Sequence, residues 1–149
     1  MERFEYAVHL EPAPEGGFVV TCRDLPALIT QGDDLDHALS EASDAMDEVF
    51  ALYMSESIAF PSATRARRRE HLVSPPPETV AKAALHTAMQ SASVSKVQLA
   101  RRLGVDEKEV RRLLDPHHSS KLPRLAEAVQ LLGRRLVIGL EDVALRGGR

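Results

Sequence analysis

The sequence predicts an α+β protein: a small antiparallel sheet with one helix, followed by an all-helical region that ends in a strand. Short runs of alternating apolar and polar residues fill the first half, and apolar residues at spacings of three and four fill most of the second. Residues 1–63 carry 2 basic and 13 acidic residues, a net of −11, whereas residues 64–149 carry 17 and 9, a net of +8. This segregation predicts partners of opposite charge, although two differently solvated surfaces would also produce it.

Strands are expected at residues 4–10, 18–22, 28–31 and 71–73. In the first run Tyr6, Val8 and Leu10 alternate with smaller or polar residues, which is the period of a strand with one buried face. Two prolines and two glycines lie within residues 11–17, so the first two strands are expected to form a hairpin.

A helix is expected over residues 35–53, because its apolar residues recur at spacings of three and four. Asp33 or Asp34 is placed to cap its first turn. The opposite face of this helix is strongly acidic and is the main source of the negative charge of the front half.

Three consecutive prolines at 75–77 cannot continue a helix or a strand ladder, and they hold the chain stiff and extended. We therefore expect a front domain over residues 1–74, a proline linker over 75–77 and a rear domain over 78–149. Rear helices are expected at 78–91, 96–103, 106–114 and 122–132, and a strand at 135–140.

Residues 95–114 have the features of a helix-turn-helix. The small Ala100 allows the second helix to cross closely over the first, and Gly104 permits the turn between them. Asp106 and Glu109 have the spacing of a capping box that opens the second helix. A short helical hairpin can show the same apolar spacing, but the charge of +8 favours DNA binding.

In a helix-turn-helix the second helix enters the major groove with its early residues at the base edges. Lys108 and Arg112 can donate to guanine, and Glu107 can accept from the amino group of cytosine. Phosphate contacts are expected from residues at a helix start, on the outer helix face and in the following loop: Lys96, Arg111, Ser119, Ser120 and Lys121.

Several classes of protein are not expected. No run approaches the roughly 18 apolar residues of a membrane helix, and the first ten residues do not resemble a signal peptide, so we expect a cytoplasmic protein. Cys22 is the only cysteine and the six histidines lack the paired spacing of a metal site, so no metal or other cofactor is expected. An enzyme is not expected either, because the carboxylates lie mostly on one exposed helix face and no nucleophile motif is present.

The order of the front motifs resembles the HicB antitoxins. The matching residues are Tyr6, Gly17-Phe18-Val19-Val20, Asp24-Leu25-Pro26, Thr30-Gln31-Gly32-Asp33, and the helix alanines Ala38, Ala42 and Ala45. Residues 95–133 resemble the helix-turn-helix domain of the phage-repressor class that one branch of this family carries. The stretch 61–74 is longer and more basic than expected of the family.

The resemblance implies a partial RNase H-like front fold that lacks the catalytic carboxylates of RNase H and binds protein. The implied partner is HicA, a small basic ribonuclease toxin with a catalytic histidine, and the implied second activity is repression of the operon through operator DNA. An acidic front half suits a basic toxin. We take four carboxylates of the acidic helix as candidate toxin contacts: Asp36, Glu41, Asp44 and Asp47.

We expect a homodimer or a dimer of dimers, because a single helix-turn-helix reads only a few base pairs. The strand expected at 135–140 has no partner strand in the rear domain, and pairing with the same segment of a second chain would satisfy its backbone. Dimerisation is therefore assigned to Leu136, Val137, Ile138 and Leu140. The alternative is that the tail folds back on its own helices.

Two other functions stay open from the sequence. The chain could be a stand-alone transcription regulator whose front domain senses a small ligand, or an enzyme with a cryptic hydrolytic site in the front half. A ligand pocket in the front domain would favour the first of these. The role of the basic segment 65–69 and the way one binding event alters the other are not predicted.

Overall fold

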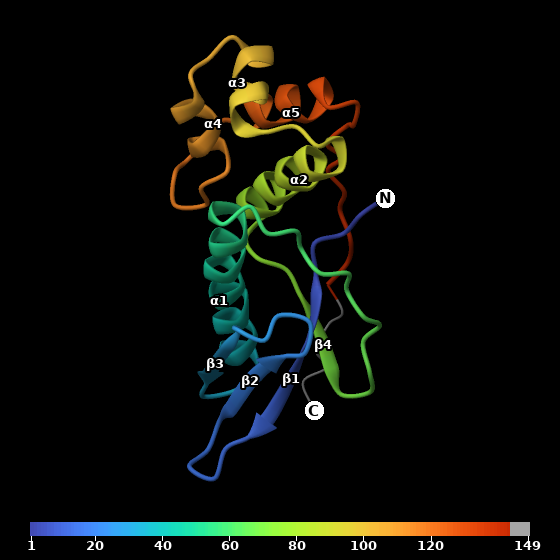
Figure 1. The fold of residues 1–149 in the computed structure, drawn as a ribbon. Coiled ribbons are helices and arrows are strands. Elements are labelled where there is room, and N and C mark those ends of the chain that lie inside the picture. The colour runs from blue at the N-terminus through green and yellow to red at the C-terminus, as the bar shows by residue number, and fades with distance from the viewer. Residues whose placement is uncertain (144–149) are drawn as a thin grey trace.

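The strands β1 (Tyr6–Pro12), β2 (Phe18–Cys22), β3 (Ile29–Gly32) and β4 (Glu70–Val73) form an antiparallel sheet in the order β3-β2-β1-β4. In the computed structural model, which describes residues 1–143, helix α1 (Leu35–Ser55) lies along this sheet and four shorter helices gather beyond its far end (Figure 1). The last part of the predicted rear domain, residues 144–149, lies outside the described residues.

The β1–β2 hairpin turns through two glycines with positive φ, Gly16 at 99° and Gly17 at 74°. A side chain on Gly17 would also clash, because a Cβ there would lie 2.4 Å from the carbonyl oxygen of Gly32. Gly32 itself lies against the first turn of α1, where a Cβ would come within 2.3 Å of the backbone nitrogen of Ala38. These two close approaches explain why glycines precede Phe18 and Asp33.

Helix α1 is capped by Asp34, whose carboxylate accepts a hydrogen bond from the backbone nitrogen of His37 at 2.8 Å. Its apolar stripe packs on the sheet, where Ala42, Met46 and Phe50 join Val8 and Val20 in the front core. The predicted front elements are therefore present, with ends displaced by two residues or fewer.

The chain between α1 and β4 is held against the sheet at several points. The Tyr6 hydroxyl donates to the carbonyl of Pro61 at 2.7 Å, and Asp24 accepts from the backbone nitrogen of Thr64 at 2.9 Å. Arg23 donates to the carboxylate of Glu70 at the start of β4. The basic segment 65–69 is thus a loop whose two ends are held to the sheet by hydrogen bonds.

Helix α2 (Pro77–Ala92) begins at the third of the three prolines, with Pro76 as its N-cap. One side of the helix places Ala83 in the front core, and another places Leu85 and Met89 in the rear core. The two hydrophobic cores consequently share this helix.

The rear core is completed by α3 (Lys96–Leu103), α4 (Glu107–Leu113) and α5 (Leu122–Leu131). Gly104, with φ of 70°, ends α3 and leads into α4, as predicted. The predicted capping box at Asp106 is only half formed: Asp106 accepts from the backbone nitrogen of Glu109, but the carboxylate of Glu109 pairs with Arg112 instead. The reciprocal capping box lies at Ser95 and Gln98.

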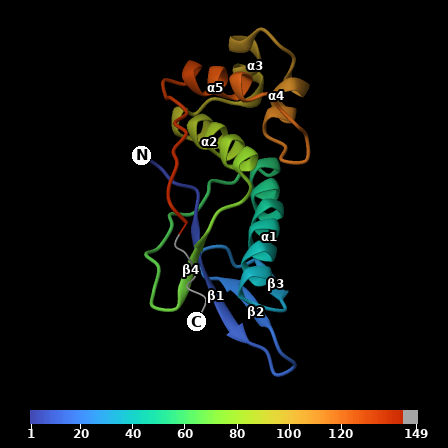
Figure 2. The same cartoon turned by 180° about the vertical axis from the view of Figure 1, so that it is seen from behind.

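The strand predicted over residues 135–140 is wrong for the single chain, because residues 134–143 form no ladder. The segment instead runs back beside the N-terminal residues, as both views show (Figures 1 and 2). Arg134 donates to Glu2 at 2.6 Å, Arg3 donates to Glu141 at 2.9 Å, and Leu136 packs on the rear core. These contacts take the place of a strand partner and match the fold-back alternative.

Candidate functional site

The outer face of α4 carries the residues predicted to read bases. Glu107 and Arg111 form an ion pair at 2.8 Å, and Glu109 pairs with Arg112. Lys108 is exposed, and no carboxylate oxygen of residues 1–143 lies within 4.0 Å of its ammonium. Of the three predicted base readers, Lys108 is thus exposed without an ion pair to residues 1–143, whereas Arg112 and Glu107 form ion pairs with other residues of α4.

The predicted phosphate contacts are not equivalent in the structure. Ser119 and Lys121 are exposed in the loop between α4 and α5, and Arg111 is exposed on α4. Lys96 is half-buried at the start of α3. Ser120 is half-buried and its polar groups already have partners: the hydroxyl accepts from Lys82 and the backbone nitrogen donates to Glu78.

Lys82 lies underneath this surface and was not predicted as a functional residue. Its side chain is 0% exposed, and its ammonium donates to the carbonyl of Arg112 at 2.8 Å and to the hydroxyl of Ser120 at 2.7 Å. Burial lowers the pKa of Lys82, an effect that the nearby Glu78 and Asp115 carboxylates oppose. The sequence did contain a signal, since this lysine interrupts the apolar stripe of α2 next to Ala81 and Leu85.

The acidic residues of α1 divide into two groups. Asp36 and Asp44 are exposed, and Glu41 lies 3.3 Å from the Nε2 atom of His37. Asp47, by contrast, accepts a hydrogen bond from the buried Thr79 hydroxyl and joins α1 to α2. The four predicted toxin contacts are therefore not one continuous free surface.

A fifth carboxylate of the same helix, Glu48, reaches the rear helices. Its Oε1 atom accepts a hydrogen bond from Nε2 of His117, in the loop after α4, at 2.8 Å. This bond raises the pKa of His117. The loop that carries Ser119 and Lys121 is thus tied to the acidic helix.

The contact between the two cores contains a second histidine. His86 of α2 is 3% exposed, donates from Nε2 to the carbonyl of Ile58 at 2.7 Å, and meets the ring of Phe60 edge-on. Burial lowers the pKa of His86, and the bond to Ile58 only partly opposes this shift.

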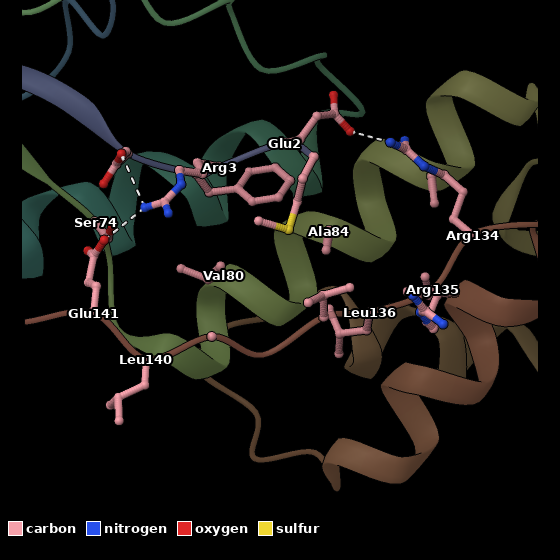
Figure 3. Close-up of a pocket in the computed structure, with 17 residues that line it drawn as sticks. Glu2, Arg3, Ser74, Val80, Ala84, Arg134, Arg135, Leu136, Leu140 and Glu141 are labelled. Carbon is pink, nitrogen blue, oxygen red and sulfur yellow. Dashed lines mark hydrogen bonds and ion pairs between the residues drawn. The ribbon is translucent and has the colours of Figure 1, made fainter.

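A pocket of about 380 Å³ lies between the N-terminal residues, α2 and the tail. Figure 3 shows Val80, Ala84 and Leu136 on its apolar side, with the Glu2–Arg134 and Arg3–Glu141 ion pairs across its rim. The pocket is formed by the fold-back of the tail and lies outside the core of the front half. Within residues 1–143, no group of three or more histidine, cysteine or carboxylate side chains comes together as a metal site.

Comparison with known proteins identifies the family. Residues 5–84 match the family described as HicB_like antitoxin of bacterial toxin-antitoxin system. Antitoxin HicB of Escherichia coli K12 is 32% identical over 131 residues, which are 88% of this chain and 95% of that protein. Antitoxin HicB of Pseudomonas fluorescens Pf0-1 is 35% identical over 139 residues, 93% of this chain and 94% of that protein.

The chain belongs to the HicB antitoxin family. The predicted resemblance to the HicB antitoxins is therefore confirmed. Antitoxin HicB 1 of Photorhabdus laumondii is 31% identical over 143 residues, 95% of this chain, so the similarity to HicB proteins extends past the front half into the rear helices. HicB membership places the chain among the antitoxins of bacterial toxin-antitoxin systems. None of the helices formed by residues 1–143 is long and apolar enough to cross a membrane.

Proposed function

We propose that this HicB-family protein binds and neutralises a small basic ribonuclease toxin of the HicA type through its front half, and represses its own operon by binding operator DNA through its rear helices. The observation that carries the proposal is the division of charge along the chain: residues 1–63 have a net charge of −11, and residues 64–149, which include the basic segment 65–69 before β4, have a net charge of +8. One chain thus presents two surfaces suited to partners of opposite sign, in the cytoplasm of a bacterial cell.

The toxin contact is assigned to carboxylates of α1. The half-buried Glu41 and the exposed Asp44 are three residues apart and so lie on the same side of the helix. A surface that holds RNA is basic, and an acidic helix both attracts it and competes with the RNA. The front fold is proposed to be a partial RNase H-like fold that serves this binding role.

DNA binding is assigned to a helix-turn-helix formed by α3 and α4, with α4 as the recognition helix. Lys108 is the first candidate base reader because it is exposed. Arg111 and Arg112 pair with glutamates of the same helix, and such surface pairs contribute only about 0–1 kcal/mol. Phosphate and base oxygens can therefore replace those glutamates when DNA approaches.

A homodimer is proposed to place two such helices on operator half-sites. Val137, Ile138 and Leu140 are exposed, Ile138 at 73%, so the tail offers apolar side chains to a second chain. The tail is held to its own chain by two exposed ion pairs and by Leu136. Because exposed pairs are weak, the tail can leave this position and pair with its counterpart as a two-stranded ribbon.

Co-expression with the neighbouring reading frame tests the proposed function. The full chain, tagged, is produced together with the protein encoded beside it, and captured. We expect a small basic protein to copurify and the growth arrest it causes to be relieved. If the neighbouring product is neither captured nor suppressed, the toxin-binding role is wrong; a small molecule retained by the chain would favour a ligand-sensing regulator instead.

A further inference from the structure

Burying the charged side chain of Lys82 completely is unfavourable for the free energy of folding. No carboxylate oxygen among residues 1–143 lies within 4.0 Å of its ammonium, and both of its hydrogen-bond acceptors are neutral. Removing a cation from water without an ion-pair partner costs free energy, and an apolar side chain of similar length can fill the same space. Packing alone therefore does not explain a lysine at this position.

What Lys82 holds is the end of α4. The carbonyl of Arg112 lies in the last turn of that helix, where a positive charge is favourable, and it accepts from Lys82 in addition to the backbone nitrogen of Asp115. The other acceptor, the Ser120 hydroxyl, lies at the far end of the loop between α4 and α5. One ammonium thus fixes the distance between the two ends of this loop.

Glu78 completes the arrangement one turn earlier in α2. Its carboxylate accepts from the backbone nitrogen of Ser120 at 2.9 Å, so α2 holds Ser120 through both its hydroxyl and its backbone. The neighbouring loop residues His118, Ser119 and Lys121 keep exposed side chains. The loop is therefore held on the side that faces α2, and its opposite side is exposed to solvent.

We propose that Lys82 and Glu78 are positioning residues for DNA binding: they set the end of α4 and the loop at 119–121 at a fixed spacing, so that the recognition helix and the phosphate contacts meet one duplex together. This inference rests on the proposed DNA-binding function of α4. Neither residue touches DNA. Their effect is to order the loop before binding, so that the cost of immobilising it does not reduce the affinity.

The test uses the full-length chain with Lys82→Met, which removes the ammonium and keeps an unbranched side chain. The Arg112 carbonyl still accepts from the backbone nitrogen of Asp115, so no buried acceptor is abandoned. We expect operator affinity to fall about tenfold, because several loop side chains must then be ordered on binding. The melting temperature is expected to stay the same or rise, since a buried charge is gone.

Salt dependence separates positioning from contact. Because Lys82 meets no phosphate, the slope of log affinity against log salt concentration should match that of the unchanged protein, whereas Lys121→Ala should reduce this slope by about one. Equal operator affinity in the Lys82→Met chain overturns the inference. So does a loss of affinity that is accompanied by a parallel fall in melting temperature, since that result assigns Lys82 to folding alone.

Glu78→Ala gives a second, independent reading and keeps the inference testable if Lys82→Met fails to fold. Removing an exposed negative charge should strengthen DNA binding if only the net charge matters. Positioning predicts the opposite, a weaker complex, because the backbone N–H of Ser120 loses the carboxylate that accepts its hydrogen bond. Stronger or unchanged binding overturns the inference. The unchanged chain is the arm that decides the proposed function: if it binds no DNA, that function is wrong regardless of the variants.

Discussion

His117 and Glu48 join the loop after α4 to the acidic helix α1, with 2.8 Å between Nε2 of the imidazole and Oε1 of the carboxylate. The two residues are 69 positions apart in sequence. Each belongs to a different proposed surface, since Glu48 lies on the helix that is proposed to bind the toxin and His117 precedes Ser119 and Lys121. The two surfaces are thus in direct contact.

This pair predicts a contribution to stability that fades as pH rises. The carboxylate raises the pKa of His117 above its ordinary value of 6.5. A group with a raised pKa in the folded state stabilises fully below its unfolded pKa, and the contribution is lost as pH rises through the folded pKa. His117→Gln should therefore lower the urea midpoint at about pH 5.5 and have little effect at about pH 9. His118→Gln, at the adjacent exposed position, is the matched control; an equal effect of both variants would contradict the pairing.

His86 predicts the opposite dependence on pH. Burial of this α2 side chain against Phe60 lowers its pKa. At mildly acidic pH the folded chain therefore keeps the ring neutral, whereas the unfolded chain takes up a proton. The free energy of unfolding should fall as pH drops below 6.5, the ordinary pKa of histidine. His86→Gln, which retains a donor for the Ile58 carbonyl, should show a weaker acid dependence in urea titrations at about pH 7.5 and about pH 5.5. An identical pH profile for the two chains would show that His86 is not the source of the acid dependence.

Most of the secondary structure follows from local pattern, and the elements that do not are decided by distant contacts. The alternation at Tyr6 and Val8 and the apolar stripe of α1 predict those elements because their periods are those of a strand and a helix, although Ala7 on the other face of the strand is buried as well. The tail is an apolar run that would suit a strand, but its conformation depends on Glu2 and Arg3 at the other end of the chain. No local rule contains that information.

The sequence predicts which residue types the candidate site contains, but it does not predict which of them are hydrogen-bonded to other parts of the chain. Lys108, Ser119 and Lys121 are exposed as expected, because a charged residue on an outer helix face or in a loop faces solvent. Nothing in the sequence distinguishes Ser120 and Asp47 from nearby serine and aspartate residues. Each nevertheless accepts a hydrogen bond from α2, Ser120 from Lys82 and Asp47 from Thr79. Which carboxylate or hydroxyl is free depends on the packing of α2 against α1 and α4.

Base readers and phosphate anchors should differ in what their removal changes. Lys108→Ala or Arg112→Ala should cost about 1–3 kcal/mol on the preferred operator and relax base preference, because the lost contact is to a base edge. Lys121→Ala should weaken binding to all sequences alike, because phosphates carry no sequence information. Titration of operator and scrambled duplexes by fluorescence anisotropy measures both effects. A uniform loss for all three variants would show that α4 is not the reading helix in this register.

The tail should decide the oligomeric state. Ile138→Pro removes a backbone donor from the proposed ribbon, so we expect a monomer that binds the operator far more weakly. Analytical ultracentrifugation of the full chain gives the mass directly. Arg134→Ala is a useful comparison: it breaks the contact with Glu2 that holds the tail in its folded-back position, and should leave the dimer intact or favour it. A dimer that survives Ile138→Pro, or an unchanged chain that sediments as a monomer, would refute the ribbon.

The proposed division of labour between the two surfaces is tested most directly by an association rate. The proposed toxin, the product of the neighbouring reading frame, is mixed with three full-length proteins: the unchanged chain, the double variant Glu41→Lys with Asp44→Lys, and Lys121→Ala. Because opposite fields steer association, the double variant should capture the toxin at least about tenfold more slowly and relieve growth arrest poorly. Lys121→Ala should capture the toxin at the unchanged rate while losing operator affinity. Equal capture rates for all three proteins, or slow capture by Lys121→Ala, would contradict the assignment of toxin binding to α1.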